Sequence, residues 1–357
     1  MKLDFKGFSL RILMFMLLVT GLTFKVEAQV VDSLEAYADR FGHYLLFRNQ
    51  DTSYISNFGN EFGVKLVAMN KFNYFSIMDF ENGTRVRYNP ARDLYLGVGF
   101  AYKWIAVDLT MGLNLYKNSD FKYQKAFDFQ GRIYSSKHFF SGTIQYYRGY
   151  KLNLAQGNDS PLKEEERIRE DMRTTNIDLQ YLYAVNYTKF SLKAPFVLNE
   201  VQEKSAGSVI IGAGFNSYSM YADSSIIPVS LSSDFSSSSN LTSLDVLSIG
   251  INAGYMYTLV LKHNFFITAS LIPGIHFYFG DYSNPDLKSL NSNVNVKLIS
   301  MNSLGYNGRR VFGGVNFSYN GMLVGAEKKL YNQLAFGKLS VFVGYRFKSK
   351  KDKLKKN

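Results

Sequence analysis

Histidine and serine are the residue types in this sequence that could support hydrolytic chemistry. A serine hydrolase needs a base within hydrogen-bonding reach of its nucleophile. Of the histidines, only His276 is expected near the same strand ends as the serines Ser217 and Ser219. No nucleophile elbow, phosphate-binding loop or dinucleotide-binding motif accompanies them. The four histidines form no close ligand pair: His43, His138, His263 and His276. We therefore predict no catalytic residues, no metal site and no cofactor, and a hydrolase is the least favoured hypothesis.

Charged residues within apolar segments are more informative. Six of them fall on the polar face of an alternating segment and are the candidates for a functional lining: Lys103, Asp108, Asp128, Arg132, Asp178 and Arg346. Both signs are present. One interpretation is a set of ion pairs that brace a narrow, closed interior. The other is a polar conduit whose charges select solutes.

The segments that carry these charges alternate with a period of two, which is typical of β-strands. In residues 105–116 the odd positions are all apolar, and the same holds for the odd positions of 339–347. The opposite face is rich in Gly, Ala, Ser and Asn and poor in Lys and Glu. A water-facing sheet would carry more long charged side chains. A small polar face instead suits the interior of a barrel whose outside contacts lipid.

The sequence therefore predicts an all-β fold, a transmembrane antiparallel β-barrel of about twelve strands. The expected strands are 61–78, 84–103, 105–116, 122–134, 138–149, 174–187, 206–221, 245–260, 264–278, 293–305, 309–325 and 337–347. A barrel in lipid must close, because an open edge leaves backbone groups unsatisfied, so the last strand should pair with the first. Fourteen strands is the alternative, since "KFSLKAPF" in the long connection 188–205 could add a strand. The same connection, or long side chains, could also occlude the lumen.

The ends of the chain indicate export. Residues 1–28 have a basic start, a short apolar run and small residues before position 28, as in a secretory signal peptide. We expect 29–60 to be a periplasmic N-terminal segment, 61–347 the barrel and 348–357 a basic periplasmic tail. There is no cysteine, which excludes disulfides and thiolate chemistry. These features predict a bacterial outer-membrane location.

The net charge of +12 could indicate binding to nucleic acid. For an exported chain, however, the phosphates of lipopolysaccharide are the more accessible anions. We therefore expect outer-membrane lipid and lipopolysaccharide as neighbours, and no nucleic acid. The final strand ends on the aromatic Phe347, which resembles the signal that barrels present to their insertion machinery.

Two connections between strands also have a predicted structure. We expect "LKEEERIREDMR" (162–173) to form a charged helix with a Glu165–Arg169 pair. We expect the serine-rich loop 230–244 to be mobile.

Several blocks resemble an uncharacterised group of bacterial outer-membrane proteins, domain of unknown function family 4421. They include "YNPARDLYLGVGFAYKW" (88–104), "KSAGS" (204–208) and "NAGYMYTLV" (252–260), and with "DTSYISNF" (51–58) and others they cover most of residues 50–347. The resemblance implies an outer-membrane barrel and implies no activity. From the residues, the leading hypothesis is a small-solute channel or transport-related pore, for a solute that the sequence does not specify. The alternative is a structural or interaction barrel with an occluded lumen, acting through its outer loops or its periplasmic tail.

Overall fold

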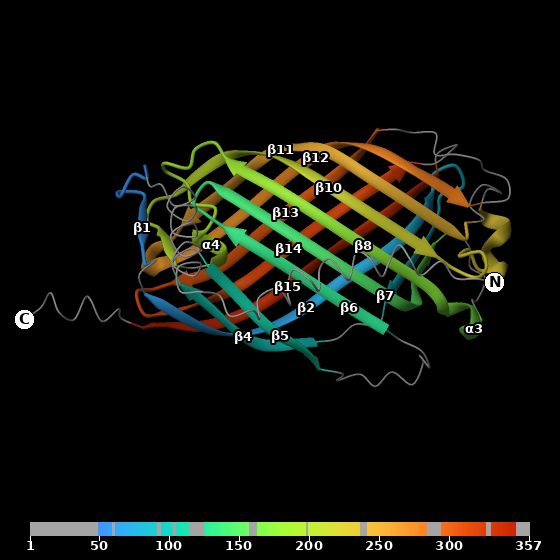
Figure 1. Cartoon of the computed structure of the whole chain (residues 1–357), viewed down its shortest axis with the longest axis horizontal. Coiled ribbons are helices and arrows are strands. Elements are labelled where there is room, and N and C mark those ends of the chain that lie inside the picture. Colours follow the sequence, from blue (N-terminus) through green and yellow to red (C-terminus); the bar gives the residue numbers. More distant parts are fainter. Residues whose placement is uncertain are drawn as a thin grey trace, which may run out of the picture. The chain divides into compact units, whose positions relative to one another are not determined.

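A computed structural model describes residues 49–58, 61–90, 94–102, 105–113, 125–156, 163–197, 199–235, 241–283, 294–325 and 330–347. Within these ranges the chain is almost entirely β-structure (Figure 1). None of the described helices is long and apolar enough to cross a membrane. The predicted signal peptide, the basic tail and Lys103 lie outside the described residues.

Thirteen strands form one antiparallel sheet. They are β2 (Phe62–Asp79), β3 (Thr84–Pro90), β4 (Leu94–Tyr102), β5 (Ile105–Leu113), β6 (Lys125–Tyr134), β7 (His138–Gln156), β8 (Ile168–Ala184), β10 (Ala206–Tyr221), β11 (Ser243–Val260), β12 (Phe265–Ser283), β13 (Val294–Asn307), β14 (Val311–Gly325) and β15 (Leu330–Phe347). Two three-residue strands, β1 (Ile55–Asn57) and β9 (Glu200–Gln202), form a separate pair. The short helices are α3 (Glu164–Arg167) and α4 (Ala194–Val197), with 3₁₀ turns η2 (Val229–Asp234) and η4 (Lys262–Asn264).

The last strand closes the barrel against the first strand of the sheet. β15 pairs with β2 over its whole length, from Leu330 opposite Asp79 to Phe347 opposite Phe62. This explains the regular alternation at the end of the chain, because every residue of β15 must match the pleat of two neighbours. The prediction of a closed transmembrane antiparallel barrel is confirmed.

The strand count differs in one region. All twelve predicted segments contain strand, but 84–103 divides into β3 and β4, which pair with successive parts of β2. β3 continues the ring to β7, whereas β4 leads on to β5, and β6 pairs only with β7. The closed ring therefore has ten strands, with β4, β5 and β6 outside it. The prediction of about twelve strands in the closed ring is corrected to ten. The reason is that β5 and β6 contribute edges that do not pair with each other in the described residues.

The apolar face of each strand points outward, as the alternation predicted. Leu109 is 60% exposed and Ile251 is 71% exposed, whereas the polar residues that alternate with them turn toward the interior. An outside made of large apolar side chains is what a bilayer requires. The barrel therefore has the surface of a membrane protein rather than that of a soluble sandwich or lipocalin.

One loop prediction is wrong in part. Residues 162–173 contain only one helical turn, α3, and β8 begins at Ile168. Arg169 therefore pairs with Asp171 at 2.7 Å, two residues along the same strand face, rather than with Glu165. In the serine-rich loop, Leu231 and Phe235 are buried, so these residues of 230–244 pack against the barrel, and the mobility of the loop stays a prediction.

Candidate functional site

One end of the barrel interior is filled by the connection between β8 and β10. We call residues 190–197 and 199–202 the α4 plug. Phe190, Leu192 and Phe196 are buried there, and β9 pairs with β1 from the start of the described chain. The plug is fixed to the wall by hydrogen bonds, since the hydroxyl of Ser303 donates to the carbonyl of Pro195 at 2.9 Å. The connection is therefore an internal element, and the extra wall strand considered for "KFSLKAPF" is not present.

A buried ion pair lies at the centre of the α4 plug. The ammonium of Lys193 and the carboxylate of Glu200 are 3.3 Å apart, and their side chains are 1% and 0% exposed. Glu200 also accepts hydrogen bonds from the hydroxyls of Ser136 and Ser191 and from the amide of Asn57. Burial alone would raise the pKa of the Glu200 carboxyl. Lys193 and the two hydroxyls outweigh burial and hold that pKa below its ordinary value of 4.5.

We expect the α4 plug to loosen in acid. A carboxyl whose pKa is lower in the folded protein contributes stability above its unfolded pKa and loses it as the pH falls through the folded value. The loss should therefore begin near pH 4.5 and grow below it. The measurement is the emission of a Phe196→Trp reporter in a Trp104→Phe background between pH 6 and pH 3. The control is the uncharged pair Lys193→Met, Glu200→Gln, and an equal acid transition in that control would contradict the assignment to Glu200.

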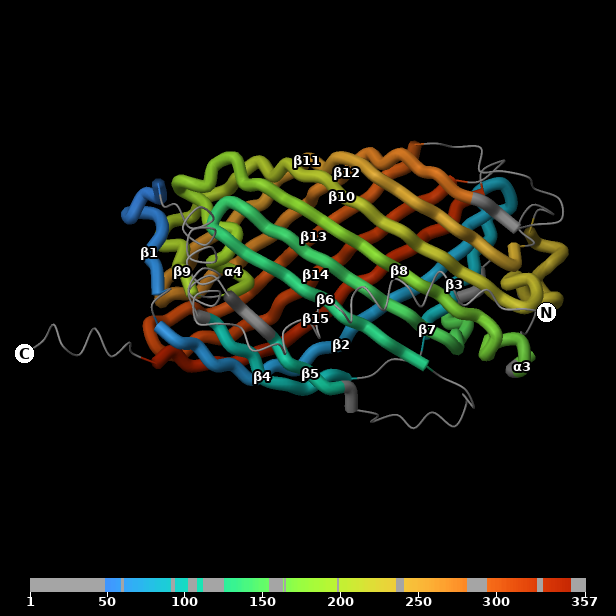
Figure 2. The backbone as a smooth tube through the Cα atoms, viewed as in Figure 1, coloured from blue at the N-terminus to red at the C-terminus, as the bar shows by residue number. Residues whose placement is uncertain are grey.

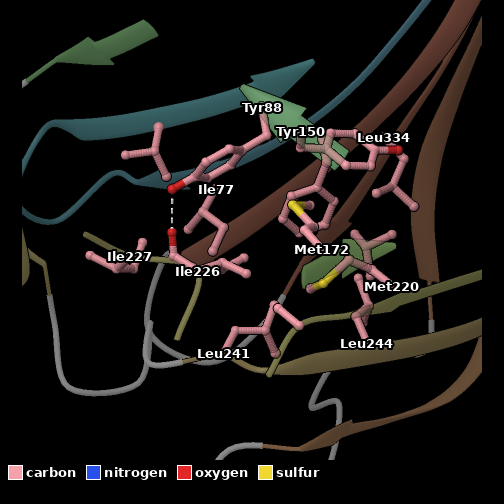
Figure 3. Close-up of a cluster of buried hydrophobic side chains, with 14 of the residues drawn as sticks. Ile77, Tyr88, Tyr150, Met172, Met220, Ile226, Ile227, Leu241, Leu244 and Leu334 are labelled. Carbon is pink, nitrogen blue, oxygen red and sulfur yellow. Dashed lines mark hydrogen bonds between the residues drawn. The ribbon is translucent and has the colours of Figure 1, made fainter. Parts of the chain in front are cut away.

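The opposite end of the interior is filled by apolar side chains. We call this cluster the α3 cap, because Glu166 of α3 accepts hydrogen bonds from Ser230 in the segment between β10 and β11 that supplies part of it. Ile226, Ile227 and Leu241 come from the segment between β10 and β11 and pack against wall residues such as Tyr88 and Met172 (Figure 3). The hydroxyl of Tyr88 donates to the carbonyl of Ile226 at 2.5 Å, which ties the segment to β3. Both ends of the barrel axis are therefore filled by packed protein.

The middle of the interior holds a continuous polar network. Asp178 accepts the ammonium of Lys297 at 2.6 Å and also hydrogen bonds from Asn320 and Asn216. From Asn216 the network continues through Asn176 and Gln145 to Asp128, which binds Lys71 at 3.1 Å. The free space beside Asp178 and Lys297 is about 10 Å³, which is at the lower limit for a single water molecule. This part of the interior has no room for a hydrated solute.

A cavity with charged walls lies nearer the α4 plug, and we call it the lateral pocket. Its volume is about 410 Å³, and it is bordered by β2, β5, β6, β14, β15 and the α4 plug. Lys65 pairs with Asp108 at 2.9 Å, and Lys71 reaches Asp128. The guanidinium of Arg132 donates to the hydroxyl of Ser318 at 3.2 Å.

Two cations of the lateral pocket have no carboxylate partner. Among the described residues, neither Arg132 nor Lys338 has a carboxylate within ion-pairing distance. Lys338 stands directly opposite Lys71 in the β15–β2 ladder, and like charges in that position repel each other. Four cations border the pocket beside one carboxylate, Asp108. Lys65 pairs with Asp108 and Lys71 with Asp128, so two cations remain without a carboxylate, which favours an anion inside.

The six candidate residues separate into three places. Asp108 and Arg132 border the lateral pocket, and Asp128 joins the pocket lysine Lys71 to the central network. Asp178 lies in the central network. Arg346 lies at the α4 end, where its guanidinium donates to Gly308 and Asn307 and stacks on Phe58 and Phe312. Lys103 is outside the described residues.

Five lysines of the interior were not among the candidates predicted from the sequence: Lys65, Lys71, Lys193, Lys297 and Lys338. Lys338 was on the polar face of the final strand, so alternation alone could have included it. Lys65 and Lys71 lie on the same face of β2 as the buried Val67 and Met69. Because that inward face mixes polar and apolar residues, alternation alone does not predict that the two lysines point inward.

The serine–histidine pairing is not supported by the geometry. His276 is fully buried and its Nε2 lies 3.3 Å from Oδ1 of Asn252 inside the barrel. Ser217 and Ser219 alternate with the inward Asn216 and Tyr218 and so point to the outer face of β10. Since the two residue types lie on opposite faces of the wall, they cannot exchange a proton directly. In the described part of the chain, no cluster of three or more His, Asp or Glu residues has metal-binding geometry.

A closed antiparallel ring with an apolar outside and a polar interior defines a transmembrane β-barrel of the outer-membrane type. Residues 49–347 match the model of a domain of unknown function, DUF4421, and the chain belongs to that family. The expected family resemblance is thereby confirmed. No curated protein matches the chain.

Solved outer-membrane proteins share the fold at low identity. The outer membrane protease OmpT from Escherichia coli is 7% identical, with 83% of this chain and 100% of that chain covered and a TM-score of 0.37. The translocator domain of the autotransporter NalP from Neisseria meningitidis is 13% identical, with 90% and 100% covered and a TM-score of 0.37. The toluene transporter TodX of P. putida is 9% identical, with 86% and 94% covered and a TM-score of 0.21. These likenesses concern the fold alone.

Proposed function

We propose that this protein is an outer-membrane barrel that is closed along its axis and binds a small anionic molecule in the lateral pocket. In this proposal it is a binding and transport-related protein rather than an open diffusion channel. The observation that carries the proposal is a pair of cations, Arg132 and Lys338, that have no carboxylate partner among the described residues and border a cavity of about 410 Å³. Cavities of several hundred cubic ångströms with a few convergent polar groups are typical ligand sites.

The filled axis supports the binding role over free conduction. The α4 plug occupies one end and the α3 cap the other, and the two spaces that border Asp178 between them are about 10 Å³ and about 40 Å³. A solute that moves along the axis would have to displace packed apolar side chains and a hydrogen-bonded network. This combines the transport-related hypothesis with the occluded interior that was its alternative.

We expect octanoate, a small carboxylate probe, to bind the refolded protein and to bind the Lys338→Met variant more weakly. A hydrogen bond between charged groups contributes about 1.5–3 kcal/mol, so the dissociation constant should rise roughly tenfold to a hundredfold. Isothermal titration calorimetry in detergent measures it. Lys262→Met is the matched control, because Lys262 is exposed in the turn after β11.

The same protein preparation should leave a planar bilayer silent, with folding checked by heat-modifiable gel mobility. Steady wild-type conductance would contradict the closed axis. Equal octanoate binding in Lys338→Met and Lys262→Met, or none in the wild type, would contradict the anion site.

A further inference from the structure

Two strand edges in the barrel wall face each other without pairing. At the α4 end of the barrel, β5 pairs with β4 and β6 pairs with β7. No ladder joins Ile105–Leu113 of β5 to Lys125–Tyr134 of β6. Figure 2 shows β5 beside β4 and β6 beside β7. Unpaired backbone groups are costly in hydrocarbon, so such an edge survives only where it borders protein or a polar cavity. The facing edges therefore mark a place where the interior meets the membrane side of the wall.

The lateral pocket passes around both of these edges. On β5 it is bordered by the inward Asp108 and also by the outward Leu109, which is 60% exposed. On β6 it is bordered by the inward Arg132 and also by the outward Phe129 and Ile133. A cavity that contacts both faces of the same strand must cross the wall at that strand's edge. The pocket thus has charged walls inside and an apolar mouth on the lipid side.

An apolar groove on the outer face continues from this mouth. It has a volume of about 590 Å³ and shares Phe129, Gly131, Arg132 and Ile133 with the lateral pocket. Gly131 stands opposite Gly142 in the β6–β7 ladder. Because neither glycine has a side chain, the outer surface is recessed there, and Phe140 and Leu179 border the recess. The groove is wide enough and apolar enough to hold a hydrocarbon chain against the outside of the barrel.

We propose that the ligand is an acyl-chain amphiphile with an anionic head, and that it enters the lateral pocket sideways from the membrane between β5 and β6. This inference rests on the anion site of the proposed function and adds the substrate class and the route. The head lies at Arg132 and Lys338, which have no carboxylate partner among the described residues. The chain extends past Leu109 and Phe129 to the groove over Gly131. A fatty acid and a lysophospholipid share this chemistry.

The experiment uses the absence of native cysteine and the single tryptophan. In a Trp104→Phe background, Phe342→Trp places a reporter in the lateral pocket, and Phe75→Trp places a matched buried reporter in the α3 cap. Bromine quenches tryptophan at close range. We expect dibrominated stearate in the bilayer to quench the Phe342→Trp reporter saturably and to leave the Phe75→Trp reporter unchanged. If Phe342→Trp does not fold, Phe196→Trp lines the same pocket and replaces it.

The route is tested by blocking the mouth. Leu109→Cys labelled with a bulky maleimide should slow quenching by about tenfold or more, whereas the same label on Ile251→Cys, on the outer face of β11, should not. Quenching that is saturable but insensitive to the Leu109 label overturns lateral entry and leaves the anion site standing. No saturable quenching, with octanoate still bound, overturns entry of a long acyl chain from the membrane and leaves the anion site standing. The same quenching is measured with brominated lysophosphatidylglycerol. The probe that binds more tightly shows whether the ligand is a fatty acid or a lysophospholipid.

Discussion

Replacing Asp178 with alanine is expected to lower the free energy of unfolding of the barrel by about 3–5 kcal/mol. The side chains of Asp178 and Lys297 are 2% and 1% exposed, and their charged atoms are 2.6 Å apart. Without the carboxylate, the Lys297 ammonium remains in the interior with no counter-ion, and the amides of Asn216 and Asn320 lose an acceptor. The measurement is the urea midpoint in detergent or vesicles, followed by heat-modifiable mobility.

A double variant separates charge from shape. Asp178→Asn with Lys297→Met removes both charges and preserves the approximate volume, so most of the lost stability should return. An Asp178→Ala midpoint equal to that of the wild type would show that water reaches Lys297, and the conduit interpretation of Asp178 would then regain support. A large loss that the double variant repairs assigns Asp178 to bracing of a closed interior.

The alternation of the strands could be predicted from the sequence because each wall residue has only two environments. A side chain in the wall meets either lipid or the interior, so Leu109 and Ile251 reveal the outer face by type alone. Closure by the last strand follows from the need to satisfy every backbone group in lipid. These are local or universal constraints, and a single sequence carries them.

The facing edges of β5 and β6 could not be predicted, since which strands pair depends on long-range geometry. Both segments alternate as well as any other, and nothing in their residues says that their edges remain apart. The α4 plug was hidden for a related reason. "KFSLKAPF" reads locally as a strand, but Pro195 cannot donate to a ladder, and Lys193 is stable inside the barrel only because Glu200 follows it seven residues later.

The extended β8 shows a third limit. Its first residues, from Ile168 to Arg173, are strongly charged and have the composition of an exposed helix. They form a strand because β7 and β10 offer paired edges, with Tyr150 opposite Arg169 and Tyr221 opposite Arg173. A strand that extends beyond the lipid-facing part of the barrel no longer needs apolar residues. Its composition therefore does not indicate that it is a strand.

Replacing Lys193 with methionine is expected to release the α4 plug while the barrel wall remains folded. Glu200 is fully buried, and its nearest cation is Lys193. Removing one partner of a buried pair costs about 3–5 kcal/mol. The hydroxyls of Ser136 and Ser191 and the amide of Asn57 still donate to the carboxylate, which places the expected loss at the lower end of that range.

Hydrogen exchange of the amides in residues 190–202 measures this loss where it occurs. If the plug opens as a local unit, a loss of about 3 kcal/mol speeds its exchange by roughly a hundredfold while strands such as β11 and β12 keep their protection. The double variant Lys193→Met, Glu200→Gln should restore most of the protection, because a neutral pair leaves no buried charge.

The distribution of the change decides how the plug and the barrel are coupled. Faster exchange in the plug alone means that the interior near Phe196, a wall of the lateral pocket, can rearrange without unfolding the ring. Equal acceleration of plug and strands means that the plug is part of the barrel's cooperative core, and the pocket is then rigid on the side away from β5 and β6. Unchanged exchange in the Lys193→Met variant contradicts the burial of Glu200 on which both the pH response and the closed axis depend.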